Sequence, residues 1–123
     1  MNSTRARILV AGFGMHFVAK LVARVGASYS LVIANSEEEA LTLLDEGNIA
    51  LAWLRQGGRF SAQRVLGLAM LIEHCIDMPV VVVAEFWPRE YSRPALTEVL
   101  SREPSLGEFL MTTRAVLDGS DLS

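Results

Sequence analysis

The sequence predicts an α/β fold with three layers, in which a doubly wound, parallel, five-stranded sheet lies between two layers of helices. Short apolar runs alternate with helical segments along the chain, and the loops between them are short. Strands that alternate with helices over short connections form right-handed βαβ units and a parallel sheet. The apolar runs are continuous rather than alternating with polar residues, as in strands that helices cover on both faces.

The first half of the chain predicts two strand–helix units and the strand that follows them. Residues 8–11 form the first expected strand, and apolar residues recur at helical spacing over residues 15–25, with Gly26 where that helix stops. Residues 29–34 form the second strand. Asn35, Ser36 and the three glutamates after them predict a helix start, because side-chain oxygens cap free N–H groups and acids favour the positive end of a helix. Gly47 ends this helix, and residues 49–54 form the third strand.

The second half continues the pattern and then becomes less regular. Ser61 is expected to cap a third helix that runs to about His74, and residues 79–84 form the fourth strand. Two prolines, Pro88 and Pro94, predict that a fourth helix is irregular or shortened. A fifth, edge strand is expected over residues 97–101 and a last helix over residues 105–117. We expect one domain over residues 1–117, and a tail or the start of a linker over residues 118–123.

Composition limits the classes of function. The chain of 123 residues has a net charge of −3, which argues against direct nucleic-acid binding by this domain. Its apolar runs are shorter than the roughly 20 residues that span a bilayer, and no signal-peptide pattern opens the sequence. The single cysteine, Cys75, cannot form an internal disulfide, and we expect it to be a small buried apolar residue. We therefore expect a cytoplasmic domain without membrane contact, metal or cofactor.

The segment Gly12-Phe13-Gly14, between the first strand and its helix, has two interpretations. As a phosphate-binding turn it lacks the third glycine of Gly-x-Gly-x-x-Gly, whose place Phe17 takes. It also lacks an acid after the second strand, where Ala34, Asn35 and Ser36 stand instead of a ribose-binding carboxylate. A small Rossmann-like nucleotide-binding regulatory module that uses Gly12-Phe13-Gly14 remains the alternative hypothesis.

The other interpretation follows from the order and spacing of three segments. Residues 32–41 read Val-Ile-Ala-Asn-Ser-Glu-Glu-Glu-Ala-Leu, residues 48–53 read Asn-Ile-Ala-Leu-Ala-Trp, and Met78-Pro79 precede the four valines. With the Arg-Ile-Leu-Val-Ala of the first strand, these segments resemble the receiver domain of bacterial response regulators over roughly residues 5–117. The resemblance implies a flavodoxin-like sheet and a role in two-component signal transduction.

The resemblance also implies where a phosphorylation site would lie. In receivers, Mg²⁺ is bound by two acids after the first strand and by an aspartate at the end of the third. That aspartate also accepts the phosphoryl group. A residue with a hydroxyl group ends the fourth strand, and a lysine follows the fifth. These positions fall here at Gly12 and Phe13, about Trp53 (Leu54 if the register slips by one), Ala84 and about Arg102. No carboxylate occurs in residues 1–36 or 47–72. The sequence therefore predicts a non-enzymatic pseudo-receiver.

Such a domain is expected to act by dimerisation or by contact with a partner protein or its own output domain. The resemblance places Tyr91, Leu100, Phe109 and Arg114 near the face through which receivers commonly associate. Trp53 and Phe13 are either ordinary core residues, or fill the former acidic cavity and hold one state, or line a small apolar ligand pocket.

Two further features have simple interpretations beside functional ones. His16, near the predicted site, is expected to be a surface or capping residue rather than a general base, because no Ser, Cys or Asp lies near it in sequence. The segment 55–59, Arg-Gln-Gly-Gly-Arg, resembles an anion-binding loop, but we expect a plain solvated turn.

Overall fold

The computed structural model describes residues 5–57, 59–76, 78–84 and 97–118, and its strands and helices form the predicted fold. Five parallel strands make one sheet in the order β2-β1-β3-β4-β5. The strands are β1 (Arg7–Ala11), β2 (Ser30–Ala34), β3 (Leu51–Arg55), β4 (Val80–Val83) and β5 (Thr97–Leu100). The helices are α1 (Met15–Val25), α2 (Glu37–Glu46), α3 (Ala62–Leu71) and α4 (Leu106–Leu117). The predicted parallel α/β sheet is confirmed, with each strand within two residues of its expected bounds.

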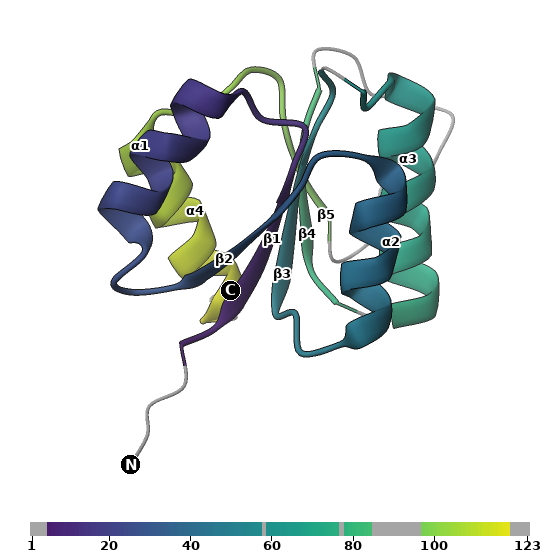
Figure 1. The fold of residues 1–123 in the computed structure, drawn as a ribbon, viewed down its shortest axis with the longest axis horizontal. Helices are drawn as coiled ribbons and strands as arrows, with labels where there is room; N and C mark the ends of the chain where they lie inside the picture. The colour runs from purple at the N-terminus through teal and green to yellow at the C-terminus, as the bar shows by residue number, and fades with distance from the viewer. Residues whose placement is uncertain (1–4, 58, 77, 85–96, 119–123) are drawn as a thin grey trace.

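Helices cover both faces of the sheet. Figure 1 shows α1 and α4 on one face and α2 and α3 on the other. Strand residues alternate between two buried clusters, so that Trp53 packs with the α1 and α4 side and Leu54 with the α2 and α3 side. The central strands β1, β3 and β4 are almost entirely buried, whereas four of the five residues of β2 are half-buried. The edge strand β2 is therefore more accessible than the central strands.

Three serines begin three of the helices. The hydroxyl oxygen of Ser36 accepts a hydrogen bond from the backbone N–H of Glu39 at 3.2 Å, and Ser61 caps α3 in the same way. At α4 the arrangement is reciprocal, because the Glu108 carboxylate also accepts the backbone N–H of Ser105 at 2.8 Å. Such caps satisfy N–H groups that have no partner inside the helix. The three caps therefore define where α2, α3 and α4 begin.

The structure differs from the sequence prediction around the end of α3. The α-helix ends at Leu71, and residues Ile72–Ile76 form a wider π-helical turn. Cys75 lies in this turn and is exposed, so the expectation of a buried cysteine was wrong: the change of helical period rotates it off the apolar face. The predicted irregular fourth helix falls within residues 85–96, outside the described residues. Within the described segments, no helix has the length and apolarity to cross a membrane.

Candidate functional site

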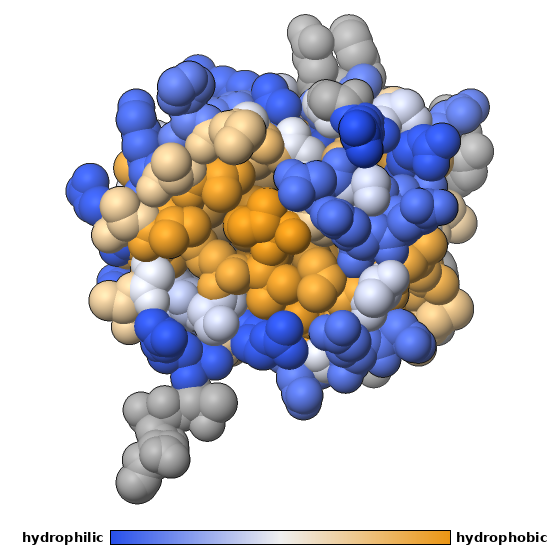
Figure 2. All heavy atoms as spheres, in the orientation of Figure 1, coloured by the Kyte–Doolittle hydropathy of each residue, from blue (hydrophilic) through white to orange (hydrophobic). Residues whose placement is uncertain are grey.

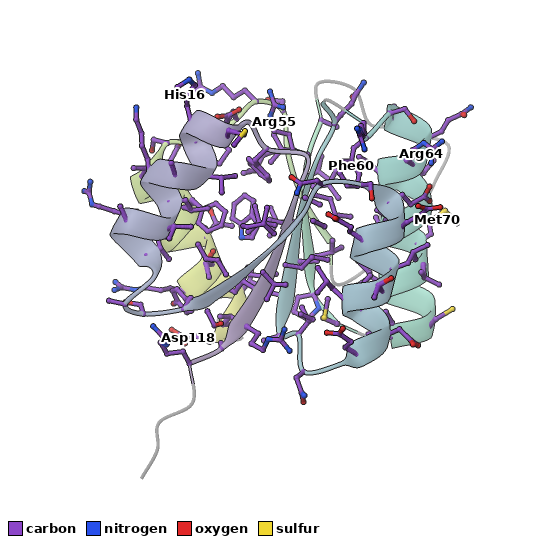
Figure 3. All side chains as sticks on the ribbon, in the orientation of Figure 1. His16, Arg55, Phe60, Arg64, Met70 and Asp118 are labelled. Atoms are coloured by element: carbon purple, nitrogen blue, oxygen red, sulfur yellow. The ribbon has the colours of Figure 1, made fainter. Side chains whose placement is uncertain are left out.

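The carboxyl ends of the strands meet at one edge of the sheet, where a hollow of about 410 Å³ opens. It lies between the ends of β1 and β3, the point at which the strand order reverses and α/β sheets commonly bind ligands. We call it the edge hollow; its lining residues are Gly12, Phe13, Gly14, Ala34, Asn35, Arg55, Gly57, Arg59 and Phe60. Figure 3 shows Arg55 and Phe60 at this upper end of the sheet, with His16 at the start of α1.

Arg55, the last residue of β3, is held from two sides. One terminal nitrogen of its guanidinium donates to the carbonyl oxygen of Gly12 at 3.2 Å. Its Nε forms an ion pair of 3.0 Å with Oε1 of Glu103, which lies in the connection between β5 and α4. Both side chains are about one-third exposed (31 % and 36 %). Arg55 therefore links the ends of β1 and β3 to the chain that follows β5.

Gly12 is required by the closeness of β1 and β3 at this edge. Its φ is +88°, a conformation that residues with a side chain rarely adopt, and a Cβ at this position would lie 1.9 Å from the carbonyl oxygen of Arg55. Gly57 makes room for the same arginine, because a Cβ there would lie 2.3 Å from its terminal nitrogen. Steric contact with Arg55 thus accounts for both glycines, and no side chain fits at residue 12 in this backbone.

The turn after β3 is tightly bonded. The backbone N–H of Gly57 donates to the carbonyl of Phe60, and the N–H of Phe60 donates back to the carbonyl of Gly57, both at 2.9 Å. Phe60 is buried and Arg59 is exposed. The chain after β3 therefore presents Arg59 to solvent, and Arg55 is fixed against the sheet.

Trp53 is not among the residues that line the edge hollow, and of its three interpretations the structure fits that of an ordinary core residue. Its side chain is fully buried on the α4 side of the sheet, where it stacks on Phe109 with ring centroids 4.1 Å apart at 20°. The indole N–H donates to the hydroxyl of Thr113 at 3.0 Å. Strand alternation is the reason, because Trp53 points to the α1 and α4 face.

Phe13 joins the edge hollow to this buried cluster. Its ring stacks on Phe17 with centroids 5.3 Å apart, and meets Trp53 edge-on at 6.2 Å and Phe109 edge-on at 6.5 Å. Offset and edge-to-face arrangements of this kind stabilise aromatic clusters. Of Phe13 and Trp53, therefore, only Phe13 lines the edge hollow.

The remaining predicted site residues are placed as follows. Ala84 is 6 % exposed, and its N–H donates to the carbonyl of Leu100 at 2.9 Å. Arg102 is exposed, and the side chain from this connection that reaches β3 is that of Glu103. His16 is exposed. Among residues 5–57, 59–76, 78–84 and 97–118, no group of three or more His, Cys, Asp or Glu side chains could hold a metal ion.

The predicted association face is only partly available. Phe109 is fully buried against Trp53, so it cannot form part of a surface, and its place in the predicted face was wrong. Arg114 is exposed and Leu100 is half-buried. Tyr91 lies outside the described residues.

Solved structures share this architecture at low sequence identity. The signal receiver domain of an HD domain-containing protein from Pseudomonas fluorescens Pf-5 matches with a TM-score of 0.72 and 16 % identity, covering 94 % of this chain and 96 % of that one. A CheY-like response regulator receiver domain protein from Methanospirillum hungatei JF-1 gives 0.73 and 16 %, covering 94 % and 95 %. A two-component response regulator from Clostridium difficile gives 0.73 and 16 %, covering 96 % and 100 %. The chain therefore has the receiver fold. No protein-family model and no curated protein matches the sequence.

Proposed function

We propose that this chain is a pseudo-receiver, which accepts no phosphoryl group and acts by protein–protein contact in bacterial signal transduction or transcription regulation. The observation that carries the proposal is the placement of Arg55. A guanidinium, tied to Glu103 and to the Gly12 carbonyl, stands at the strand ends where a working receiver gathers its carboxylates.

The charges at this edge are the reverse of those that phosphorylation needs. Mg²⁺ prefers carboxylate oxygens, and the phosphoryl acceptor of a receiver is itself a carboxylate at the end of the third strand. Here the third strand ends in Arg55, and the residue that meets it after the fifth strand is acidic. The sequence supplies glycine, phenylalanine, tryptophan and alanine at the positions of the acids and hydroxyl. Arg55 and Glu103 lie two residues and one residue beyond the positions that the resemblance gives to the aspartate and the lysine, Trp53 and Arg102.

The buried aromatic cluster supports the same proposal. Trp53, Phe109 and Thr113 are buried and joined by stacking and a hydrogen bond, and Phe13 and Phe17 pack on this group. Close-packed interiors have few alternative arrangements. We infer that this end of the domain is held in one conformation by its own side chains, without a metal, cofactor or enzymatic step.

Amide NMR tests the proposal. The ¹⁵N-labelled protein is recorded with and without acetyl phosphate, and with and without a beryllofluoride mimic, each in the presence of Mg²⁺. We expect no saturable, site-specific shifts, because no carboxylate takes the acceptor position. Shifts localised around Gly12, Trp53 and Ala84 would contradict the proposal, and a phosphorylatable receiver treated in parallel shows that the reagents are active.

The nucleotide-binding module is retained as a second candidate because the edge hollow includes Gly12, Phe13 and Gly14 beside two arginines. Thermal-shift measurements with NAD, ATP and cyclic dinucleotides test it. Gly14 is the informative site for mutation, because a Cβ there has no atom within 4 Å and the fold tolerates one. A stabilisation by one of these nucleotides that Gly14→Val abolishes, while the melting temperature of the free variant is retained, would favour this candidate.

A further inference from the structure

We propose that the outer edge of β2 binds an extended segment of a partner protein, added to the sheet as a strand, whose side chains alternate between apolar and basic residues. The proposal names the partner class for the interaction role given above and rests on that role. Three features support it: an open strand edge, an apolar flank on one face of the sheet and an acidic flank on the other.

The first feature is the strand itself. β2 pairs regularly with β1 over all five of its residues, and the described part of the chain places no strand on its other side. Its sequence, Ser-Leu-Val-Ile-Ala, has none of the charges, prolines or bulges that commonly protect an exposed edge. An edge of this kind offers free backbone groups to a further strand, and peptides bind other proteins in this way.

The second feature is an apolar surface on the α1 side, which we call the β2 patch: Val18, Val22, Leu31 and Ile33. Phe17 of α1 contacts Phe109 of α4, so the opposite flank of α1, which carries Val18 and Val22, is turned away from α4 and toward β2. Val22 is 48 % exposed. Figure 2 shows an apolar area in the middle of the view, where Figure 1 places β2 between α1 and α2.

The third feature is the acidic flank on the α2 side. α2 carries five acidic residues and no basic one. Glu39, Thr42, Leu43 and Glu46 follow one another at helical spacing on a single stripe, and the first three of these line a hollow of about 510 Å³ with Glu38 and with Ile33 of β2. Figure 2 shows polar surface bounding the apolar area on this side.

These charges are available to a partner. Among the described residues there are two ion pairs, Arg55 with Glu103 and Arg64 with Glu37, and neither uses Glu38 or Glu46. The Glu39 carboxylate already accepts the N–H of Asn35 at 2.6 Å. A basic side chain over this flank would therefore find two exposed carboxylates.

The two flanks together specify the alternation. Successive side chains of a strand point to opposite faces of the sheet, so an added strand presents every second residue to the α1 side and the others to the α2 side. The first set meets the β2 patch and the second set meets the acidic flank. A second copy of β2 fits less well, because its residues are all uncharged.

Fluorescence anisotropy with labelled peptides tests the proposal. The probe is a short peptide alternating valine and lysine, and the comparison peptides are one alternating valine and glutamate and one with the same valines and lysines in two blocks. We expect saturable binding of the alternating valine–lysine peptide, weaker binding of the block peptide and none of the glutamate peptide. Binding is expected to weaken with added salt, because exposed charges are screened. Amide NMR shifts should localise to residues 30–34.

Matched variants separate the two flanks. Glu46→Lys should weaken binding about fivefold, the size expected for one exposed ion pair, whereas Asp45→Lys makes the same change on a side of α2 turned away from β2. Val22→Ser should weaken binding about threefold or more through lost apolar contact, and Ala23→Ser is its control. All four residues are exposed, so the fold should survive each change.

Several results would overturn the proposal: no saturable binding, equal binding of the block peptide, NMR shifts away from β2, or controls that weaken binding as much as the paired variants. Light scattering is recorded at the same concentrations. A dimer that Val22→Ser dissociates would assign the edge to a second copy instead. Phosphorylation of the protein would refute the proposed function while leaving the peptide result standing, and absent peptide binding would leave the NMR test of phosphorylation unaffected.

Discussion

Replacing Thr113 by valine tests the contact that joins the sheet to α4. Thr113 and Trp53 are both fully buried, and the indole N–H donates to the threonine hydroxyl at 3.0 Å. Valine has nearly the shape of threonine but offers no acceptor, so the indole N–H would remain buried without a partner. A buried donor left unsatisfied costs about 1–3 kcal/mol. We expect Thr113→Val to lower the free energy of unfolding by about 2 kcal/mol.

The matched controls come from the same pair. Thr113→Ser keeps the hydroxyl and loses one methyl group, which should cost about 1 kcal/mol. Trp53→Phe removes the donor, and a double-mutant cycle with Thr113→Val isolates the pair, with an expected coupling energy of about 1 kcal/mol. Urea unfolding followed by circular dichroism gives the free energies. In a domain of this size, a loss of about 2 kcal/mol also lowers the melting temperature by roughly 6–12 °C.

The reasoning is refuted if Thr113→Val is as stable as the parent chain while Thr113→Ser is not. That outcome would mean that the hydroxyl contributes nothing and that the methyl group alone matters. A coupling energy near zero would likewise show that the indole and the hydroxyl are not bonded.

Two further predictions concern the backbone at the sheet edge and the start of α4. Gly12→Ala should lower the free energy of unfolding by about 2 kcal/mol or more, because residue 12 has a φ of +88° and its Cβ would collide with the Arg55 carbonyl. The control, Gly14→Ala, should lower it by less than about 1 kcal/mol in the same urea titration. A tolerated alanine at residue 12 would contradict the close approach of β1 and β3. Ser105→Ala should lower the free energy of unfolding by about 1 kcal/mol, because it removes the cap of α4, and Ser105→Asp should retain most of the parent stability. Equal stability of the parent protein and these two variants would show that the capping box contributes nothing.

The fold was predictable because its signals are local. Continuous valines at β4, serine caps before α2, α3 and α4, and the glycine after α2 each act within a few residues of chain. The exception is the end of α3, where the helical period widens over Ile72–Ile76. A π-helical turn uses the same apolar residues as an α-helix, so composition there cannot distinguish the two.

The site was only partly predictable, because it depends on contacts between distant segments. The sequence indicated that the acids of a receiver are missing, and that Gly12 and Phe13 stand at the edge. It did not pair Arg55 with Glu103, which are 48 positions apart and belong to no local motif. The direction of Trp53 depended on strand register, since a shift of one residue moves a side chain to the opposite face.

Under the proposed function, a signal could act at the edge hollow or at the outer edge of β2, and the contacts at the two places differ. A ligand shifts a conformational equilibrium only by its difference in affinity for two states. At the edge hollow, Arg55 is already bound by Glu103 and Gly12, and the aromatic cluster beneath is closed, so an added anion would have to displace contacts within the chain. At β2, by contrast, no strand of the described residues pairs with the outer edge. We therefore expect regulation through occupancy of the β2 edge, set by the concentration of the partner, rather than through a chemical change at the strand ends.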